Sequence, residues 1–194
     1  MRQSLNIRSR AALAALLLCC WLSAGGAELR SVTVTQVGAR YHLVSEAWFA
    51  ASREDLYRVL TDYDLFSQFS SVYVDTRNLA PDDLGRPRFY TRMEGCMLFF
   101  CKSFRRNGYL VLTPPREIVA VADPADSDFN YSRERWRLKK DGDGTLMTYD
   151  FKMEPSFWVP PVIGPFVIKR TLRHGGADAI NRIEALALGR QPDK

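Results

Sequence analysis

The sequence predicts an α+β protein in which one curved antiparallel sheet packs against a long C-terminal helix. From residue 32 to residue 153, strand-forming segments are separated by turn residues, with only two short helical patterns near the N-terminal end. Between Val162 and Leu188, apolar residues recur every three or four positions, as on one face of an amphipathic helix. The clearest strand is apolar on one face only, so we expect the long helix to cover that face.

The first 27 residues match the pattern of a secretory signal peptide. Residues 2–10 carry three arginines and no acid, Ala11–Leu22 is an unbroken apolar run, and Ser23–Ala27 contains mostly small residues. The apolar run of 12 residues is shorter than the ~20 that a membrane-spanning helix needs. We therefore expect residues 1–27 to be removed near Ala27 during secretion across the inner membrane, which places residues 28–194 in the periplasm.

The charge of the chain lies largely in this leader. The whole sequence has 27 basic and 22 acidic residues, and removal of the three leader arginines leaves 24 basic against 22 acidic. A nearly balanced charge gives no support for a nucleic-acid partner. The remaining 167 residues suit a single domain, and no repeat or low-complexity linker divides them.

The first expected elements are two strands followed by two short helices. Val32–Val37 and Tyr41–Trp48 are rich in strand-forming residues and are separated by a glycine. Ser52 is a typical helix N-cap, with acidic residues in the turn that follows it. A second short helix is expected after Asp64; Asp62 and Asp64 suit caps between the two helices better than acid and base roles.

A meander of at least five strands is expected between residues 72 and 153. In Leu146–Glu154 apolar and polar residues alternate, as in a strand covered on one side. The preceding Asp141–Gly144 has the sequence DGDG, a strong hairpin signal. It does not match a calcium loop, because Thr145 stands where an acidic ligand is required.

Motifs for metal or catalytic chemistry are not found. His42 and His174 are not at zinc-ligand spacing from each other or from cysteine, and there is no nucleophile elbow, phosphate loop or dinucleotide fingerprint. We therefore expect no metal, no cofactor and no catalytic residues, and nothing in the sequence requires an enzyme. Arg133, Arg135 and Arg137 share one strand face, which is either solvated or in contact with phospholipid headgroups.

A hydrophobic pocket is the stronger functional hypothesis. Aromatic residues concentrate in the second half of the chain, and Phe157 and Trp158 lie in a proline-rich connection that suits a pocket mouth. Gly176 falls on the apolar stripe of the long helix, where it either allows the close approach of a sheet aromatic or a simple kink, or leaves space for a ligand. The candidate pocket residues are Met93, Phe100, Phe129, Tyr131, Trp136, Tyr149, Phe151, Met153, Phe157, Trp158, Leu172, Gly176 and Ile180.

Cys96 and Cys101 are the two cysteines that remain after leader removal. An oxidising compartment favours a disulfide between them. A straight strand would separate them by about 16 Å, whereas a disulfide needs Cα atoms within about 7 Å. Either the chain bulges or reverses over residues 97–100 and the pair is bonded, or the segment is a plain strand with two free thiols that line the cavity wall.

The order of elements resembles the START-like helix-grip fold of the SRPBCC superfamily, which includes polyketide cyclase/dehydrase and coenzyme-Q-binding proteins. The resemblance spans residues 41–188 and is carried by Val59–Val72, the cysteine segment, Asp128–Leu138, Gly144–Phe151 and Pro155–Arg170. It implies a deep apolar cavity between the long helix and the sheet that holds lipids, quinones, sterols or polyketides. It is specific for fold and weak for function.

Three functions follow from this resemblance and from the residues. The first is an exported carrier of a hydrophobic small molecule of the lipid or quinone class, with transient membrane contact as a further hypothesis. The second is a cyclase or dehydratase in which Tyr149 acts as acid or base. The third is a protein-interaction module whose pocket is filled by its own side chains.

Overall fold

One antiparallel sheet of eight strands forms the framework of the protein. The structure is a computed structural model that describes residues 26–97, 100–157 and 163–192. The strands are β1 (Glu28–Val37), β2 (Arg40–Phe49), β3 (Tyr73–Leu79), β4 (Arg88–Met97), β5 (Phe100–Thr113), β6 (Glu117–Ala122), β7 (Phe129–Asp141) and β8 (Gly144–Pro155). Their spatial order is β1-β2-β8-β7-β6-β5-β4-β3, so β3 to β8 form the predicted meander and β2 pairs with β8.

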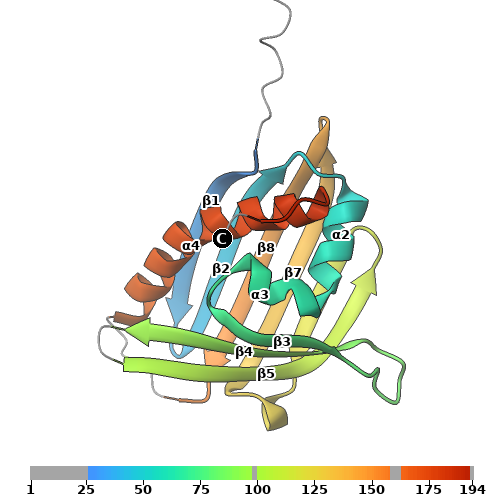
Figure 1. Ribbon diagram of the computed structural model, residues 1–194. Coiled ribbons are helices and arrows are strands. Elements are labelled where there is room, and N and C mark those ends of the chain that lie inside the picture. The colour runs from blue at the N-terminus through green and yellow to red at the C-terminus, as the bar shows by residue number, and fades with distance from the viewer. Residues whose placement is uncertain (1–25, 98–99, 158–162, 193–194) are drawn as a thin grey trace, which may run out of the picture.

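The helices gather on one face of this sheet, which we call the inner face. The α-helices are α2 (Arg53–Thr61), α3 (Phe66–Phe69) and α4 (Ile163–Ala187), and the 3₁₀ turns are η2 (Tyr63–Leu65) and η3 (Pro124–Asp126). Figure 1 shows α4 lying across the curved sheet, with α2 and α3 beside its C-terminal end. This is the α+β helix-grip arrangement that the sequence predicts. Within the described part of the chain, no helix is both long and apolar enough to cross a membrane.

Local sequence signals explain where the first helix begins and ends. The hydroxyl of Ser52 accepts a hydrogen bond from the backbone N–H of Asp55, as predicted for an N-cap. Asp62 ends α2, and its carboxylate accepts the N–H of Asp64 at the start of η2. Asn78 of β3 donates to both Asp62 and Asp64. These aspartates therefore act as caps and tie the helices to the sheet edge.

The hairpin between β7 and β8 forms at the predicted DGDG turn. Asp141 pairs with Gly144, and Gly142 has a φ of 61°, a left-handed conformation that favours glycine. A side chain at Gly144 would collide with the carbonyl oxygen of Phe49. Both glycines are therefore required by the backbone path.

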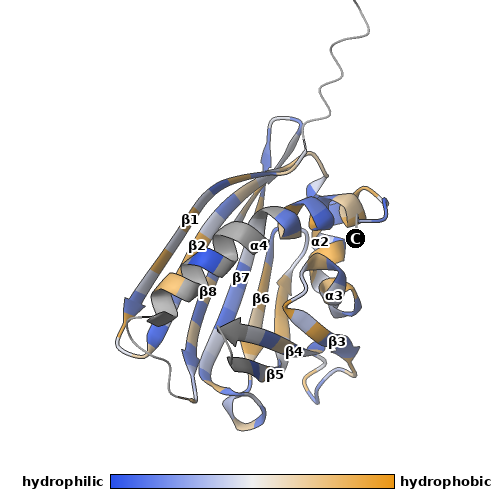
Figure 2. Cartoon of the chain, turned by 60° about the vertical axis from the view of Figure 1, so that its left-hand side comes forward, coloured by the Kyte–Doolittle hydropathy of each residue, from blue (hydrophilic) through white to orange (hydrophobic). Residues whose placement is uncertain are grey.

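The hydrophobic core lies between the inner face and the helices. Figure 2 shows apolar and polar bands alternating along the strands, as expected when one face is covered and the other is wet. Around α2 and α3 the rings of Phe66 and Phe89 stack on Tyr63. From the long helix, Ile180, Ile183 and Ala187 join the same cluster.

Candidate functional site

A buried ion pair stands in the middle of this otherwise apolar interior. Arg106 of β5 and Glu134 of β7 are 0% and 1% exposed, respectively. The Nη1 atom of Arg106 lies 2.7 Å from Oε1 of Glu134 and donates a hydrogen bond to it. Removing two charges from water costs several kcal/mol for each ion, and hydrophobic replacements are often as stable. A pair in this place therefore requires an explanation other than fold stability.

Strand register explains how these two side chains meet. Arg106 stands opposite Thr91 of β4, and Glu134 stands opposite Phe151 of β8, so both residues point to the inner face. β6 separates their strands, and its inner-face residues there are Ala120 and Ala122. Neighbouring strands are about 4.8 Å apart, so long side chains on β5 and β7 can join above two alanines.

Several polar atoms around the pair have unused hydrogen-bonding capacity. Tyr149 donates its hydroxyl to Oε1 of Glu134 at 3.0 Å. Nε and Nη2 of Arg106, Oε2 of Glu134 and the hydroxyl of Tyr63 are buried and find no hydrogen-bond partner among the described residues. More than 90% of buried polar groups in proteins are satisfied, so this concentration of free donors and an acceptor points to a binding site. We call Arg106, Glu134, Tyr149 and Tyr63 the polar cluster.

Burial fixes the protonation states in the polar cluster. Desolvation raises the pKa of the Tyr63 and Tyr149 hydroxyls well above the usual value, and the negative charge of Glu134 raises them further. Desolvation is the largest single influence on the pKa of Arg106 and lowers it, but the attraction of the Glu134 carboxylate and the smaller raising contributions together outweigh it, so the net direction is upward. The tyrosines therefore remain neutral and Arg106 remains charged across the physiological pH range.

Aromatic rings surround the polar cluster. The guanidinium of Arg106 lies 5.5 Å from the ring centre of Phe89 and 5.4 Å from that of Phe151. Trp136 packs against Tyr149, with their ring centroids 5.3 Å apart. An apolar wall with a few polar groups at its centre is typical of small-molecule sites.

The structure brings some of the predicted pocket residues to this region and places others elsewhere. On the inner face of the sheet lie Met93, Phe129, Trp136, Tyr149, Phe151 and Met153. Ile180 of α4 is buried in the core. Tyr131 lies beyond a register shift in β7, on the outer face, where the guanidinium of Arg40 covers its ring. The side chains of Phe100, Trp158 and Leu172 lie outside the described residues.

Phe157 packs against the beginning of β5. Its ring stacks on Phe104 with centroids 4.9 Å apart, and Nζ of Lys102 lies 3.6 Å from its ring centre. Phe104 in turn lies beside Phe129 on β7. These contacts hold Phe157 against one end of the inner face, which is where a residue at the pocket mouth is expected.

Gly176 approaches the first strand of the sheet. A Cβ atom at this position would lie 3.4 Å from Cδ2 of Leu29 on β1, and α4 continues unbroken through the glycine. An alanine would fit at this distance, and the neighbour is an aliphatic rather than an aromatic side chain, so this contact does not decide between the packing and ligand-space interpretations of Gly176.

The backbone reverses in the cysteine segment. β4 and β5 form a hairpin in which Cys96 and Cys101 are directly opposite. Opposite residues in antiparallel strands have Cα atoms about 4.5–5.5 Å apart, which is within disulfide range. The straight-strand alternative is therefore wrong for the backbone. The cysteine side chains lie outside the described part of the chain.

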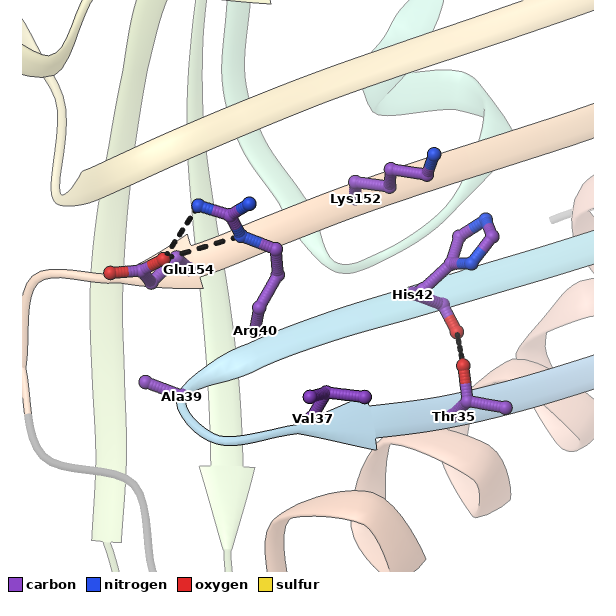
Figure 3. A pocket seen from close by; sticks show the side chains of 7 residues that line it. All are labelled: Thr35, Val37, Ala39, Arg40, His42, Lys152 and Glu154. Atoms are coloured by element: carbon purple, nitrogen blue, oxygen red, sulfur yellow. Dashed lines mark hydrogen bonds and ion pairs between the residues drawn. The ribbon is translucent and has the colours of Figure 1, made fainter.

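The outer face of the sheet carries the predicted arginine stripe and a shallow hollow. Arg133 and Arg137 are exposed, and Arg135 forms a half-exposed ion pair with Glu117. A hollow of about 510 Å³ lies along β1, β2 and β8. Figure 3 shows His42, Lys152 and the Arg40–Glu154 ion pair, which line it in part. This open, charged hollow is on the face opposite the polar cluster and does not suit an apolar ligand.

Sequence reasoning missed Arg106 and Glu134, although the alternation contained a signal for both. Ser132, Glu134, Trp136 and Leu138 occupy the face of β7 opposite the arginine stripe, so Glu134 is the charged member of an otherwise inward-facing set. Arg106 likewise lies on the same face of β5 as Phe104 and Leu110. A charged residue among inward-facing apolar positions of a strand is therefore the sequence signal for this buried polar cluster.

Comparison with known proteins identifies the class. Residues 49–179, more than half of the chain, match the family described as polyketide cyclase / dehydrase and lipid transport, and the chain belongs to that family. No match was found among curated proteins.

Solved structures agree on the fold. A START superfamily protein from Mycobacterium smegmatis aligns with a TM-score of 0.60 at 22% identity, over 75% of this chain and 98% of its own. A STAR-related lipid transfer protein from Xanthomonas axonopodis aligns with a TM-score of 0.59 at 17% identity, over 85% of this chain and 98% of its own. The Zhui aromatase/cyclase from a Streptomyces species aligns with a TM-score of 0.57 at 12% identity, over 77% of this chain and 94% of its own. At these identities the likeness shows the fold alone.

Proposed function

We propose that this protein is an exported, periplasmic carrier that holds a hydrophobic small molecule of the lipid or quinone class between α4 and the inner face of the sheet. The observation that supports it is the polar cluster, a buried ion pair with free donors and a free acceptor inside an aromatic wall. Apolar burial at about 25 cal/mol per Å² would supply affinity. The polar cluster would fix the orientation of the ligand.

The chemistry of the polar cluster constrains the polar group of the ligand. Arg106 offers two free N–H-bearing atoms, and Glu134 offers one free oxygen. Because the pair already neutralises its own charge, it favours a neutral group that accepts hydrogen bonds, such as a carbonyl or hydroxyl. An anionic headgroup would approach the Glu134 carboxylate and be repelled.

Ligand retention tests this proposal. The full chain, expressed with its leader and purified from the periplasm, should carry a reproducible apolar ligand in native mass spectrometry and solvent extraction. Turnover of a polyketide-like substrate without retention would favour a cyclase or dehydratase instead. An empty interior would favour the interaction module.

A matched pair of double variants tests the site. Arg106→Met with Glu134→Leu should abolish binding of an isoprenoid quinone while the protein remains folded. The control, Arg135→Met with Glu117→Leu, removes the same residue types from a half-exposed pair on the outer face and should bind normally. Equal binding by both variants would exclude the polar cluster as the ligand site.

We also propose a Cys96–Cys101 disulfide that joins β4 to β5 near the mouth. The support is the opposite register of the two residues together with the expected oxidising compartment. Labelling of free thiols in the denatured, unreduced protein should modify neither cysteine. Modification of both would show a plain hairpin with free thiols.

A further inference from the structure

A second buried carboxylate, remote from the polar cluster, contacts the beginning of the chain. Glu184 of α4 is 6% exposed. Its Oε2 atom accepts a hydrogen bond from the backbone nitrogen of Ala27 at 2.7 Å, and its Oε1 accepts one from the nitrogen of Ala50 at 2.6 Å. Figure 1 shows why they meet: the start of β1, the connection from β2 to α2 and the C-terminal half of α4 lie at one end of the molecule.

No ion pair found among the described residues includes the carboxylate of Glu184. Backbone amides can satisfy the lone pairs of a buried carboxylate, but they leave its charge unbalanced. The site would be complete if one of the two nitrogens were itself positively charged.

The Ala27 nitrogen can become that cation. The expected leader ends among small residues, and the rule of small residues at the first and third positions before the cut allows three neighbouring bonds. Cleavage after Gly25 uses Ser23 and Gly25, cleavage after Gly26 uses Ala24 and Gly26, and cleavage after Ala27 uses Gly25 and Ala27. Only cleavage after Gly26 makes the Ala27 nitrogen the new α-amine.

We propose that the leader is removed by hydrolysis of the Gly26–Ala27 bond, and that the new α-ammonium of Ala27 forms a buried ion pair with Glu184. Water adds hydroxyl to the Gly26 carbonyl carbon and a proton to the Ala27 nitrogen as the C–N bond breaks. At neutral pH the new carboxyl group loses a proton and the amine gains one. A membrane-bound leader peptidase cleaves the chain before it folds, so the Glu184 contact does not block access to the bond.

The surroundings of Ala27 favour this bond over the next one. Its methyl group packs against the hydrophobic core, and β1 begins immediately afterwards, with Glu28 paired to Trp48 of β2. Cleavage after Ala27 would remove both that packing and the donor to Oε2 of Glu184. Cleavage before Ala27 keeps both and adds the missing charge.

This inference rests on the proposed export but not on ligand binding, and the mass of the secreted protein tests it. Intact-mass measurement of the periplasmic protein should give an N-terminus at Ala27. A secreted protein that begins at Glu28 or at another residue would overturn the inference while leaving export standing. An uncleaved chain retained in the cytoplasm would overturn export and this inference together.

A thermodynamic cycle tests the ion pair itself. Mature chains that begin at Ala27 or at Gly26 differ by one glycine: in the first the Ala27 nitrogen is the α-amine, and in the second it is an amide and the α-amine lies one residue earlier. Glu184→Gln should lower the folding equilibrium constant about tenfold more in the Ala27 form, because bonds between charged partners are the stronger ones. Glu28→Gln, next to the terminus but exposed, is the control and should show no such coupling. Equal effects of Glu184→Gln in both forms would overturn the ion pair.

Discussion

Two buried glutamates illustrate two different uses of a charge in the interior. Glu184 has a backbone hydrogen bond on each carboxylate oxygen and joins Ala27, just before β1, to α4. Glu134 has a guanidinium and a tyrosine hydroxyl on one oxygen, while the other oxygen has no partner among the described residues. Burial alone does not separate the two, since they are 6% and 1% exposed. The unused hydrogen-bonding capacity distinguishes a binding group from a structural one.

The largest effect on stability should come from removing one partner of the Arg106–Glu134 ion pair. Arg106→Met leaves Glu134 buried without its counterion, and we expect a loss of about 3–5 kcal/mol in the free energy of unfolding. Urea denaturation followed by circular dichroism would measure it. The double variant with Glu134→Leu should recover most of that loss, because an apolar pair can replace a buried ion pair. A double variant as unstable as the single one would mean that the pair is structural.

The second prediction concerns Glu184. Glu184→Ala leaves the N–H groups of Ala27 and Ala50 without their acceptor, and we expect a loss of about 2–4 kcal/mol in the free energy of unfolding. Ligand affinity of the folded fraction should be unchanged, since Glu184 is not part of the polar cluster. Urea denaturation and quinone titration on the same sample separate the two quantities. Reduced quinone affinity with unaltered stability would show that Glu184 is a ligand-binding residue and not a structural one.

The difference between the glutamates also marks the limit of what the sequence could predict. The meander, the Ser52 cap and the long helix were predicted correctly because periodicity and turn residues are local signals. The Arg106–Glu134 pair joins strands on either side of β6, and its geometry depends on the small side chains of that strand. Such a contact is visible only when the register is known, although the inward position of Glu134 could have been inferred from alternation.

Tyr131 shows how one register shift can move a residue to the other face. Uninterrupted alternation from Phe129 would place Tyr131 beside it on the inner face. The irregularity between the two residues instead directs Tyr131 outward, beneath Arg40. Nothing in the composition of Asp128–Leu138 predicts the position of that irregularity. A site inferred from alternation is therefore least certain near the end of a strand.

The third prediction concerns the pH dependence of stability that arises from Tyr149, which donates a hydrogen bond to Glu134. The folded state raises the pKa of Tyr149 above the ordinary value of 10.0, while the unfolded chain titrates near that value. The stabilisation is therefore complete below about pH 10 and decreases as pH rises toward the higher folded pKa, by up to about 1.4 kcal/mol per pH unit for one proton. Tyr149→Phe should cost about 1 kcal/mol at pH 7 and make stability fall less steeply in alkali. Denaturant midpoints between pH 8 and pH 11 would measure both effects, and an unchanged alkaline slope would contradict the assigned cause.

The smallest effect is expected at Gly176, where the helix itself contacts the first strand. A Cβ at this position would be 3.4 Å from Leu29, an ordinary contact, so Gly176→Ala should fit and should stabilise α4 by up to about 1 kcal/mol. Gly176→Leu places a large side chain against β1 and should instead lower the melting temperature. Thermal unfolding of both variants, each with and without quinone, checks the direction. If Gly176→Leu abolished quinone binding without lowering the melting temperature, Gly176 would provide ligand space rather than packing, and the ligand site would extend beyond the polar cluster toward β1.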